Sequence, residues 1–267
     1  MAFIVSIAGS DSSGGAGNQA DVLCIEALGH HALSVITAVT AQDTRGVQHI
    51  AHTDETTVRS QLDAVFSTFK VGAVKSGMLP NAVSIQSLAK ILQDQSNPHP
   101  YVLDPVLFAS SGELLVQEES MQVMVQELFP LATVVTPNIS EAERLTGRNI
   151  NTLEEIIAAG SEILKLGCRA VLITCGHAES DPGVDVFLDS HSKDVPYYIH
   201  GRYIEDRSPR GTGCTYASAI ACGLASHLTL YDAIQNAKRY ITLAIANAYR
   251  VESDYWLLNH QVAASEL

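Results

Sequence analysis

Short apolar runs alternate with stretches of helical spacing along almost the whole chain. Brief β-branched runs bounded by glycine, proline or polar residues predict buried strands, whereas apolar residues that recur about every three or four positions predict amphipathic helices. We therefore expect strands at Phe3–Ala8, Leu33–Thr40, Gly72–Lys75, Tyr101–Leu103, Thr133–Val135, Ala170–Thr174, Val184–Leu188 and Val195–Ile199. We expect helices at about Gly17–Leu28, Thr56–Phe69, Pro80–Leu92, Met121–Leu128, Ser140–Leu145, Thr152–Leu166, Cys214–Ser226 and Leu230–Tyr249.

This alternation predicts an α/β fold with a central, mainly parallel sheet covered by helices on both faces. The polar segment between the last two strands favours a hairpin there. Pro80 suits the first position of a helix, and Thr152 suits an N-cap that pairs with Glu155. Because no linker, repeat or low-complexity segment divides the sequence, we expect residues 1–267 to form a single domain.

Composition narrows the classes of partner. The hydrophobic fraction of 46% is large enough for a full core, and the formal net charge is −13. That charge argues against nucleic acid or an anionic membrane as a general partner. An acidic protein can still bind phosphate when backbone N–H groups, helix N-termini and Mg²⁺ form the site.

The five cysteines are an odd number and lack the paired spacing of a metal site, so we expect reduced thiols in a cytoplasmic protein. The N-terminal segment Met1–Ser6 is a predicted strand without a basic region or cleavage site, which argues against a signal peptide. No apolar run has membrane-spanning length.

The segment Gly211-Thr212-Gly213-Cys214 leads directly into an Ala-rich predicted helix. Two glycines at a helix start let backbone N–H groups converge on an anion, and the helix dipole adds partial positive charge there. In the first turn, Cys214 would meet the same field, which lowers the pKa of a thiol. The alternative is a glycine-rich turn beside a buried, inert cysteine, and the spacing alone leaves both open.

The segment Gly9–Gly17 lies between the first predicted strand and the first predicted helix. It is not a P-loop, because no lysine follows a glycine in the required register. Gly15–Ala20 satisfies the loose dinucleotide pattern G-x-G-x-x-[GA]. That pattern places its first glycine directly after the strand, whereas six residues, Gly9–Gly14, intervene here. A dinucleotide site is therefore weakly supported.

Polar and apolar residues follow several predicted strands at the edge where ligands bind in open α/β sheets. Gln42, Met78 and Asp104 share this position, which predicts a common binding rim. Glu141, three residues after Asn138, would suit a water of Mg²⁺, since this ion keeps several waters and takes few carboxylates. The alternative is a helix N-cap at Asn138 or Ser140, with Glu141 near the positive helix end.

The segment Cys175-Gly176-His177 has two potential metal ligands but no second pair, which makes a poor zinc site. We therefore expect no transition metal bound by protein side chains.

Several blocks in this order resemble the hydroxymethylpyrimidine and phosphomethylpyrimidine kinases of thiamin biosynthesis, within the ribokinase-like superfamily. The blocks run from about residue 5 to residue 225, and their combination is far more specific than any one motif. They are Ala8–Gly17 with Gln19–Asp21, Thr37–Gln42, Val74–Leu79, Leu103–Val106, Thr136–Ala142 and Gly211–Thr215.

The resemblance implies a ribokinase-like three-layer sandwich and ATP-dependent phosphorylation of 4-amino-5-hydroxymethyl-2-methylpyrimidine, followed by phosphorylation of its monophosphate. It implies ATP and Mg²⁺ as cofactors, a small-molecule substrate and a homodimer. Cys214 matches the general base position, which is Asp in most other branches. Because some pyridoxal kinases also carry Cys there, a pyridoxal kinase remains an alternative.

The resemblance also implies roles for other residues. Asp21 and Gln42 match positions that hydrogen-bond the pyrimidine. Asn138 and Glu141 match the Asn-x-x-Glu element that organises Mg²⁺ and phosphate, with Glu141 acting through water. Gly9, Met78 and Val106 match positions that line the substrate pocket. Gly211, Thr212 and Gly213 match the anion hole. The positions matched on the nucleotide side are Asp104, Thr174, Gly176 and Arg210.

The sequence departs from the family pattern at four places, one of which is Asn18 in place of an apolar residue in the first predicted helix. The usual His before the anion hole is Arg210, and a common Lys is Thr174. A Gly-rich C-terminal segment is replaced by Glu252–Leu258. One hypothesis is that positive charge has moved from the position of Thr174 to Arg210; the alternative is that Arg210 points to solvent. The missing Lys also leaves open a non-catalytic binding protein, and the glycines leave open an NAD-dependent oxidoreductase.

Overall fold

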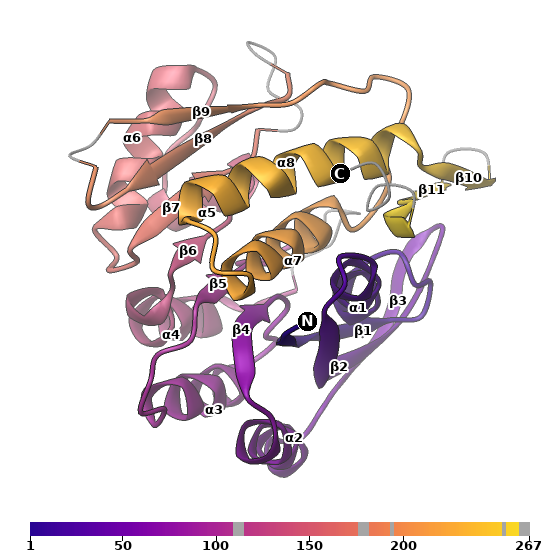
Figure 1. The fold of residues 1–267 in the computed structure, drawn as a ribbon, viewed down its shortest axis with the longest axis vertical. Coiled ribbons are helices and arrows are strands. Elements are labelled where there is room, and N and C mark those ends of the chain that lie inside the picture. The colour runs from indigo at the N-terminus through magenta and orange to yellow at the C-terminus, as the bar shows by residue number, and fades with distance from the viewer. Residues whose placement is uncertain (109–114, 176–181, 193–194, 253–254, 262–267) are drawn as a thin grey trace.

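The computed structural model describes residues 1–108, 115–175, 182–192, 195–252 and 255–261, and its centre is a nine-stranded sheet (Figure 1). The strand order is β3-β2-β1-β4-β5-β6-β7-β8-β9. These strands are β1 (Phe3–Asp11), β2 (His31–Asp43), β3 (Gly46–His52), β4 (Val71–Ser76), β5 (Tyr101–Leu103), β6 (Val134–Val135), β7 (Ala170–Ile173), β8 (Val184–Asp189) and β9 (Tyr197–His200). A separate pair contains β10 (Tyr249–Glu252) and β11 (Tyr255–Leu257).

Six neighbouring strands of the sheet pair in parallel, in the order β2-β1-β4-β5-β6-β7. Antiparallel pairs extend the sheet at both edges, with β3 at one edge and β8 and β9 at the other. The predicted hairpin between the strands expected at Val184–Leu188 and Val195–Ile199 is confirmed by the antiparallel pairing of β8 with β9. The prediction of a mainly parallel sheet is therefore also confirmed.

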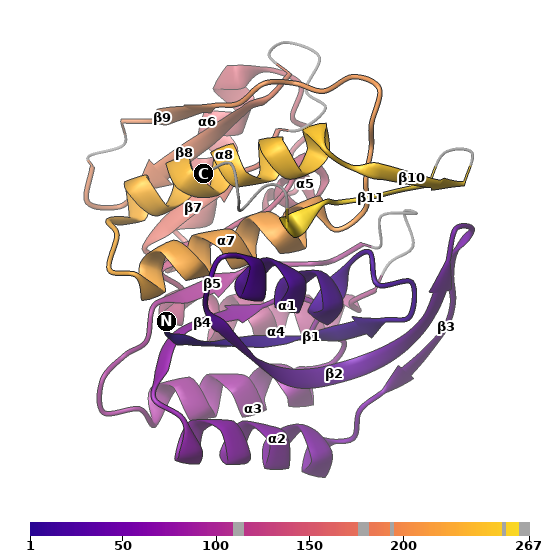
Figure 2. The same cartoon turned by 45° about the vertical axis from the view of Figure 1, so that its right-hand side comes forward.

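Helices cover both faces of the sheet, as Figure 2 shows. One face packs against α2 to α6, and the other packs against α1, α7 and α8. The helices are α1 (Gly17–Ala27), α2 (Glu55–Thr68), α3 (Ala82–Gln93), α4 (Glu118–Glu127), α5 (Ile139–Thr146), α6 (Leu153–Leu164), α7 (Thr212–Ala225) and α8 (Leu230–Ala246), with a 3-10 turn at Phe129–Leu131. The predicted three-layer sandwich is confirmed.

The alternation of side chains along each strand explains why both faces are covered. In β1, Val5 and Ile7 enter the core beneath α2 and α3, whereas Ile4 enters the core beneath α1 and α7. Both sets are fully buried, as expected for parallel strands with apolar residues on both faces.

Local helix signals agree with the sequence except at Pro80. Thr152 is the N-cap of α6 and closes a capping box with Glu155, as predicted. The expected helix start at Pro80 is wrong, because Asn81 is the N-cap and its side chain accepts a hydrogen bond from the Ser84 amide. Within the described part of the chain, no helix combines the length and apolar character needed to cross a membrane.

Candidate active site

A cavity of about 1430 Å³ lies at the carboxyl ends of the parallel strands, where the start of α7 crosses them. Most of the residues singled out from the sequence line this cavity. They are Gly9, Gln42, Met78, Asp104, Val106, Asn138, Glu141, Thr174, Arg210, Gly211, Thr212, Gly213 and Cys214. Asp21 does not line it, and Gly176 lies outside the described residues. The predicted common rim of Gln42, Met78 and Asp104 is therefore present.

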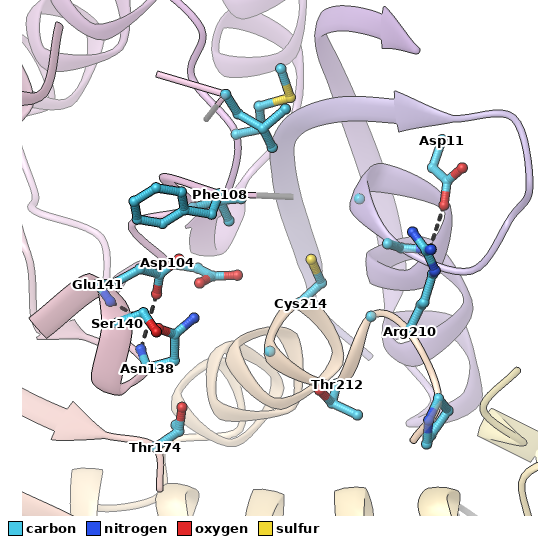
Figure 3. Close-up of a pocket in the computed structure, with 18 of the residues that line it drawn as sticks. Asp11, Asp104, Phe108, Asn138, Ser140, Glu141, Thr174, Arg210, Thr212 and Cys214 are labelled. Carbon is cyan, nitrogen blue, oxygen red and sulfur yellow. Dashed lines mark hydrogen bonds between the residues drawn. The ribbon is translucent and has the colours of Figure 1, made fainter. Parts of the chain in front are cut away.

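The N-terminal loop is held by Asp11 at the end of β1. Its carboxylate accepts hydrogen bonds from the amides of Ser13 and Ala16, at 2.8 and 2.9 Å. The amide of Asp11 in turn donates to Gln19 of α1 at 2.8 Å. These bonds fix the loop without an external ligand and place Asp11 in the cavity lining (Figure 3).

The glycine-rich start of α7 depends on close backbone packing against that loop. Gly211 has φ of 76°, and a Cβ atom there would lie 2.1 Å from the carbonyl oxygen of Gly15. A side chain is therefore excluded at this position. The following N–H groups begin a helix of 14 residues, so the N-terminal end of its dipole faces the cavity. The geometry fits the predicted anion hole.

Cys214 lies in the first turn of α7 and is half-buried. Burial raises the pKa of its thiol to about 12, and the Asp104 and Asp21 carboxylates add to that effect against the opposing charge of Lys75. The expected lowering of this pKa is thus wrong for the protein without ligands. The helix dipole and the Gly17 amide do not outweigh desolvation, so the thiol is protonated at neutral pH.

Lys75 is a fully buried cation that the sequence reasoning missed, although its strand was recognised. Its Nζ atom lies 2.9 and 3.0 Å from the two carboxylate oxygens of Asp21, and 3.7 Å from Oδ2 of Asp104. Burial opposes its charge, yet these carboxylates hold the pKa of Lys75 above its usual value. The signal in the sequence was a single lysine at the end of an apolar strand.

The prediction that Asp21 contacts the pyrimidine is not supported by its position. The side chain is fully buried between α1 and α7 and accepts hydrogen bonds from Ser6 at 2.6 Å and Ser218 at 2.9 Å, besides those from Lys75. All of these bonds lie inside the core. Asp21 therefore acts on the cavity from inside the core, through its bonds to Lys75 and through its charge, which raises the pKa values of Cys214 and Asp104.

The start of α5 combines a helix cap with the predicted metal element. Asn138 is the N-cap, and its side chain accepts from the Glu141 amide while Glu141 accepts from the Asn138 amide, both at 2.9 Å (Figure 3). The capping interpretation of Asn138 is therefore correct, and it does not remove either residue from the cavity lining. Burial, followed by the charge of Asp104, raises the pKa of Glu141 to about 8.

Asp104 is the second buried acid of this side. Burial raises its pKa to about 6 against the charge of Lys75, and Oδ2 has no hydrogen-bond partner among the described residues. Two close carboxylates with raised pKa values fit a cation that brings its own water and phosphate ligands. Among the described residues, no cluster of three or more His, Cys, Asp or Glu side chains could hold a metal ion.

The part of the cavity lined by Gly9, Gln42 and Met78 carries no charged group on these three residues. Gly9 lies at a β-bulge between β1 and β2, and a Cβ atom there would lie 3.0 Å from Sδ of Met78. Gln42, at the end of β2, is held through its backbone, which donates to the Ser12 hydroxyl at 2.8 Å and accepts from it at 2.9 Å. Its side-chain amide makes no hydrogen bond within the described part of the chain, so it is available to a ligand.

Thr174 continues β7 towards the nucleotide side expected from the sequence. Its amide donates to the Pro137 carbonyl at 2.9 Å, and it forms an isolated parallel bridge with Asn138. The next amide, of Cys175, donates to Asp185 at 3.0 Å, and Asp185 pairs with Lys238 at 2.7 Å. This strand end is thus fixed by buried contacts without a lysine at position 174.

Arg210 lies on the Asp11 side of Cys214, across from Thr174 and Glu141 (Figure 3). It is half-buried, and its guanidinium carbon lies 5.4 Å from the centre of the Tyr255 ring. The alternative that Arg210 points to solvent is therefore wrong. Tyr255 and Trp256, both from the C-terminal departure, also line the cavity. Sequence reasoning marked that segment as unusual but assigned it no contact with the site.

Known proteins that are similar in sequence to this chain are kinases of one family. A family model described as phosphomethylpyrimidine kinase matches residues 11–259. The hydroxymethylpyrimidine/phosphomethylpyrimidine kinase of Rhizobium meliloti is 43% identical over 252 residues, which cover 94% of this chain and 93% of that protein. The thiamine biosynthesis bifunctional protein ThiED of Geobacter sulfurreducens is 42% identical over 99% of this chain, which spans 53% of that longer protein.

A solved structure also has the same fold. The ADP complex of Bacillus subtilis pyridoxal kinase superposes with a TM-score of 0.91 at 31% sequence identity, and the match covers 98% of each chain. Both classes of vitamin kinase anticipated from the sequence are therefore represented among similar proteins.

Proposed function

Because the chain belongs to the phosphomethylpyrimidine kinase family, we propose that it transfers the γ-phosphoryl group of ATP to 4-amino-5-hydroxymethyl-2-methylpyrimidine and then to the resulting monophosphate. It is a phosphotransferase of thiamin biosynthesis. The observation that carries the proposal is one cavity shared by the glycine-rich start of α7, the Asn138–Glu141 element and the polar pocket around Gln42.

The acceptor pocket is the part lined by Gly9, Gln42, Met78 and Val106. The amide of Gln42 offers both a donor and an acceptor, which suits a pyrimidine carrying an exocyclic amine beside a ring nitrogen. The thioether of Met78 adapts its shape to a flat ring. These residues orient the ring so that its 5-hydroxymethyl group points towards Cys214.

The nucleotide phosphates lie, in this proposal, between the start of α7 and the start of α5. Backbone N–H groups of Gly211, Thr212 and Gly213 donate hydrogen bonds to the negative charge that develops on the transferring group. Glu141 would hold Mg²⁺ through a water, and Asp104 would contribute the second negative charge nearby. Thr174 donates a hydrogen bond where related proteins place a cation, and Gly176 belongs to the same proposed nucleotide side.

When bound, Mg²⁺ would neutralise phosphate charge, and ATP would supply the phosphoryl group. The acceptor oxygen forms a new bond to the γ-phosphorus while the bond to the ADP oxygen breaks. Cys214 first loses its own proton to solvent, and its thiolate then takes the hydroxyl proton as general base. The charge of the buried Lys75 stabilises this thiolate. Arg210 supplies positive charge beside the anion hole.

A pyridoxal kinase of the same fold is the second candidate, because the solved pyridoxal kinase superposes over nearly the whole chain. The experiment that separates the two gives equimolar hydroxymethylpyrimidine and pyridoxal to the protein with limiting ATP and Mg²⁺. Mass spectrometry then quantifies the two products. We expect the pyrimidine product in at least tenfold excess, and an excess of pyridoxal phosphate would reverse the assignment.

The same proposal includes the setting of the enzyme. We infer a homodimer in the cytoplasm, with residues 1–267 forming one kinase domain. The resemblance to hydroxymethylpyrimidine and phosphomethylpyrimidine kinases supports the dimer, and free cysteines support a reducing compartment. A sheet that recruits strands from residue 3 to residue 200 supports a single domain.

A further inference from the structure

The cavity contains an unusual balance of charge. Its described lining includes the carboxylates of Asp11, Asp104, Glu141 and Glu252. Arg210 is the sole Lys, Arg or His residue among the described residues of that lining. Any second phosphate group that enters beside ATP therefore meets several acids and one permanent cation.

The position of the Arg210 side chain is fixed by its contact with Tyr255. Its guanidinium packs over the Tyr255 ring, and the Tyr255 hydroxyl donates to Oγ of Ser13 at 2.7 Å. Ser13 in turn donates to the Asp11 carboxylate at 2.9 Å. The C-terminal hairpin and the N-terminal loop thus fix the aromatic surface on which the cation rests.

The guanidinium also has unused hydrogen-bonding capacity. Its Nη1 atom is buried and has no hydrogen-bond partner among the described residues. A buried donor without a partner costs free energy, which an anionic ligand would recover. Because the fork of an arginine matches two oxygens of one phosphate, the ligand that best fits this atom is a phosphate group.

The position of Arg210 distinguishes two phosphates that enter the site. Asn138, Glu141 and Thr174, assigned to the nucleotide, lie on one side of Cys214, and Arg210 lies on the other (Figure 3). The acceptor pocket around Gln42 is lined in part by the loop that Asp11 fixes. Arg210 therefore lies on the side of Cys214 opposite to the residues assigned to the nucleotide, the side on which Asp11 fixes the loop.

We propose that Arg210 binds the phosphate of the phosphorylated acceptor and thereby determines the efficiency of the second phosphorylation. The inference rests on the proposed function. In that step an oxygen of the acceptor phosphate bonds to the γ-phosphorus of ATP, and the bond to ADP breaks. Arg210 offsets repulsion between two phosphate groups brought to contact distance, a need that does not arise with the uncharged alcohol.

Arg207 provides a matched control. Its guanidinium packs over the Trp256 ring at 5.4 Å, in the same manner as Arg210 over Tyr255. It donates to the Ala246 carbonyl and does not line the cavity. Arg207→Gln removes the same charge and a similar stacking contact without touching the proposed phosphate position.

The test compares kcat/KM for hydroxymethylpyrimidine and for its monophosphate in the wild type, Arg210→Gln, Arg210→Lys and Arg207→Gln. We expect Arg210→Gln to lower the value for the monophosphate about 10- to 100-fold more than the value for the alcohol, as for loss of a charged hydrogen bond. Arg210→Lys retains the charge but not the fork and should lie between. Arg207→Gln should leave the ratio of the two acceptors unchanged.

Calorimetric titration of the monophosphate without ATP gives a second readout. Affinity should fall in Arg210→Gln and persist in Arg207→Gln. Equal losses for both acceptors, or a rise confined to the KM for ATP, would overturn the role in acceptor recognition. If the wild type phosphorylates neither acceptor, the proposed function fails, and the titration still decides whether Arg210 binds this phosphate.

Discussion

At the scale of single residues, the buried cluster of Lys75, Asp21 and Asp104 sets the charge beneath Cys214. One cation lies among two carboxylates, and hydroxyls of Ser6 and Ser218 complete the bonding of Asp21. Such clusters stabilise a protein only while every member is present, because each lost partner leaves a buried charge uncompensated.

Lys75→Met should therefore destabilise the fold strongly. Removal of one partner of a buried ion pair typically costs about 3–5 kcal/mol, and we expect the free energy of unfolding in urea to fall by that amount. Lys90→Met is the matched control, since Lys90 forms an exposed pair with Asp94 at 3.6 Å. Similar losses in the two variants would contradict the structural role of Lys75.

Cys214→Ala should lower kcat about 10²- to 10⁴-fold, the usual contribution of a general base. Because the pKa of the thiol is about 12 in the free enzyme, log kcat/KM of the wild type should rise with pH across the neutral and alkaline range. The variant should lose that rise. Cys222→Ala removes a buried thiol from the same helix outside the cavity and should keep the profile. Full activity in Cys214→Ala would make the thiol a packing group only.

Sequence patterns identified which residues line the cavity, but they did not predict what surrounds each of these side chains. The order of the motifs identified Gln42, Glu141 and Cys214, because parallel strands and the start of α7 bring their ends together. A motif does not state which side of a helix faces the ligand, so Asp21 was assigned to the pyrimidine although it faces Lys75. The raised pKa of Cys214 depends on burial and distant carboxylates, which no local pattern contains.

At the scale of elements, the start of α5 performs two tasks with one pair of side chains. The capping box of Asn138 and Glu141 stabilises the helix and also positions a carboxylate in the cavity. The start of α6 has the same box, made by Thr152 and Glu155, but Glu155 is only half-buried and lies outside the cavity lining. The two boxes separate the capping role from the proposed metal role.

Glu141→Gln should weaken activity most at low Mg²⁺ and recover in part at high Mg²⁺. Glu155→Gln should leave the Mg²⁺ dependence unchanged. Because the pKa of Glu141 is about 8, raising the pH through that value ionises the carboxylate. The Mg²⁺ concentration for half-maximal wild-type activity should therefore fall from pH 6 to pH 9. An equal loss at every Mg²⁺ concentration would assign Glu141 to capping alone.

The elements missed from the sequence share a physical feature. Apolar runs identified the interior strands, since parallel strands are buried on both faces. β3 lies at the edge of the sheet, with most of its residues at least partly exposed, and β10 is exposed throughout. Their mixed polar composition offers no apolar run to detect. The tail that contains β10 and β11 supplies Tyr255 to Arg210, so part of the site was missed with it.

At the scale of the whole molecule, the two faces of the sheet supply different halves of the site. Helix α7 brings the anion hole from one face, and α5 brings Asn138 and Glu141 from the other. The carboxyl ends of the strands lie between them and carry the acceptor pocket. Fold class was predictable from the alternation of elements, whereas the approach of residues 13 and 255 required the three-dimensional structure.

The central claim is that this cavity moves the γ-phosphoryl group of ATP to the pyrimidine in two successive steps. A ³¹P NMR time course of the protein with ATP, Mg²⁺ and hydroxymethylpyrimidine tests it most directly. We predict loss of the γ-phosphate signal, growth of a phosphomonoester signal and its later replacement by the two signals of a diphosphate ester. An unchanged ATP spectrum, or release of orthophosphate at the same rate without the acceptor, would contradict the claim.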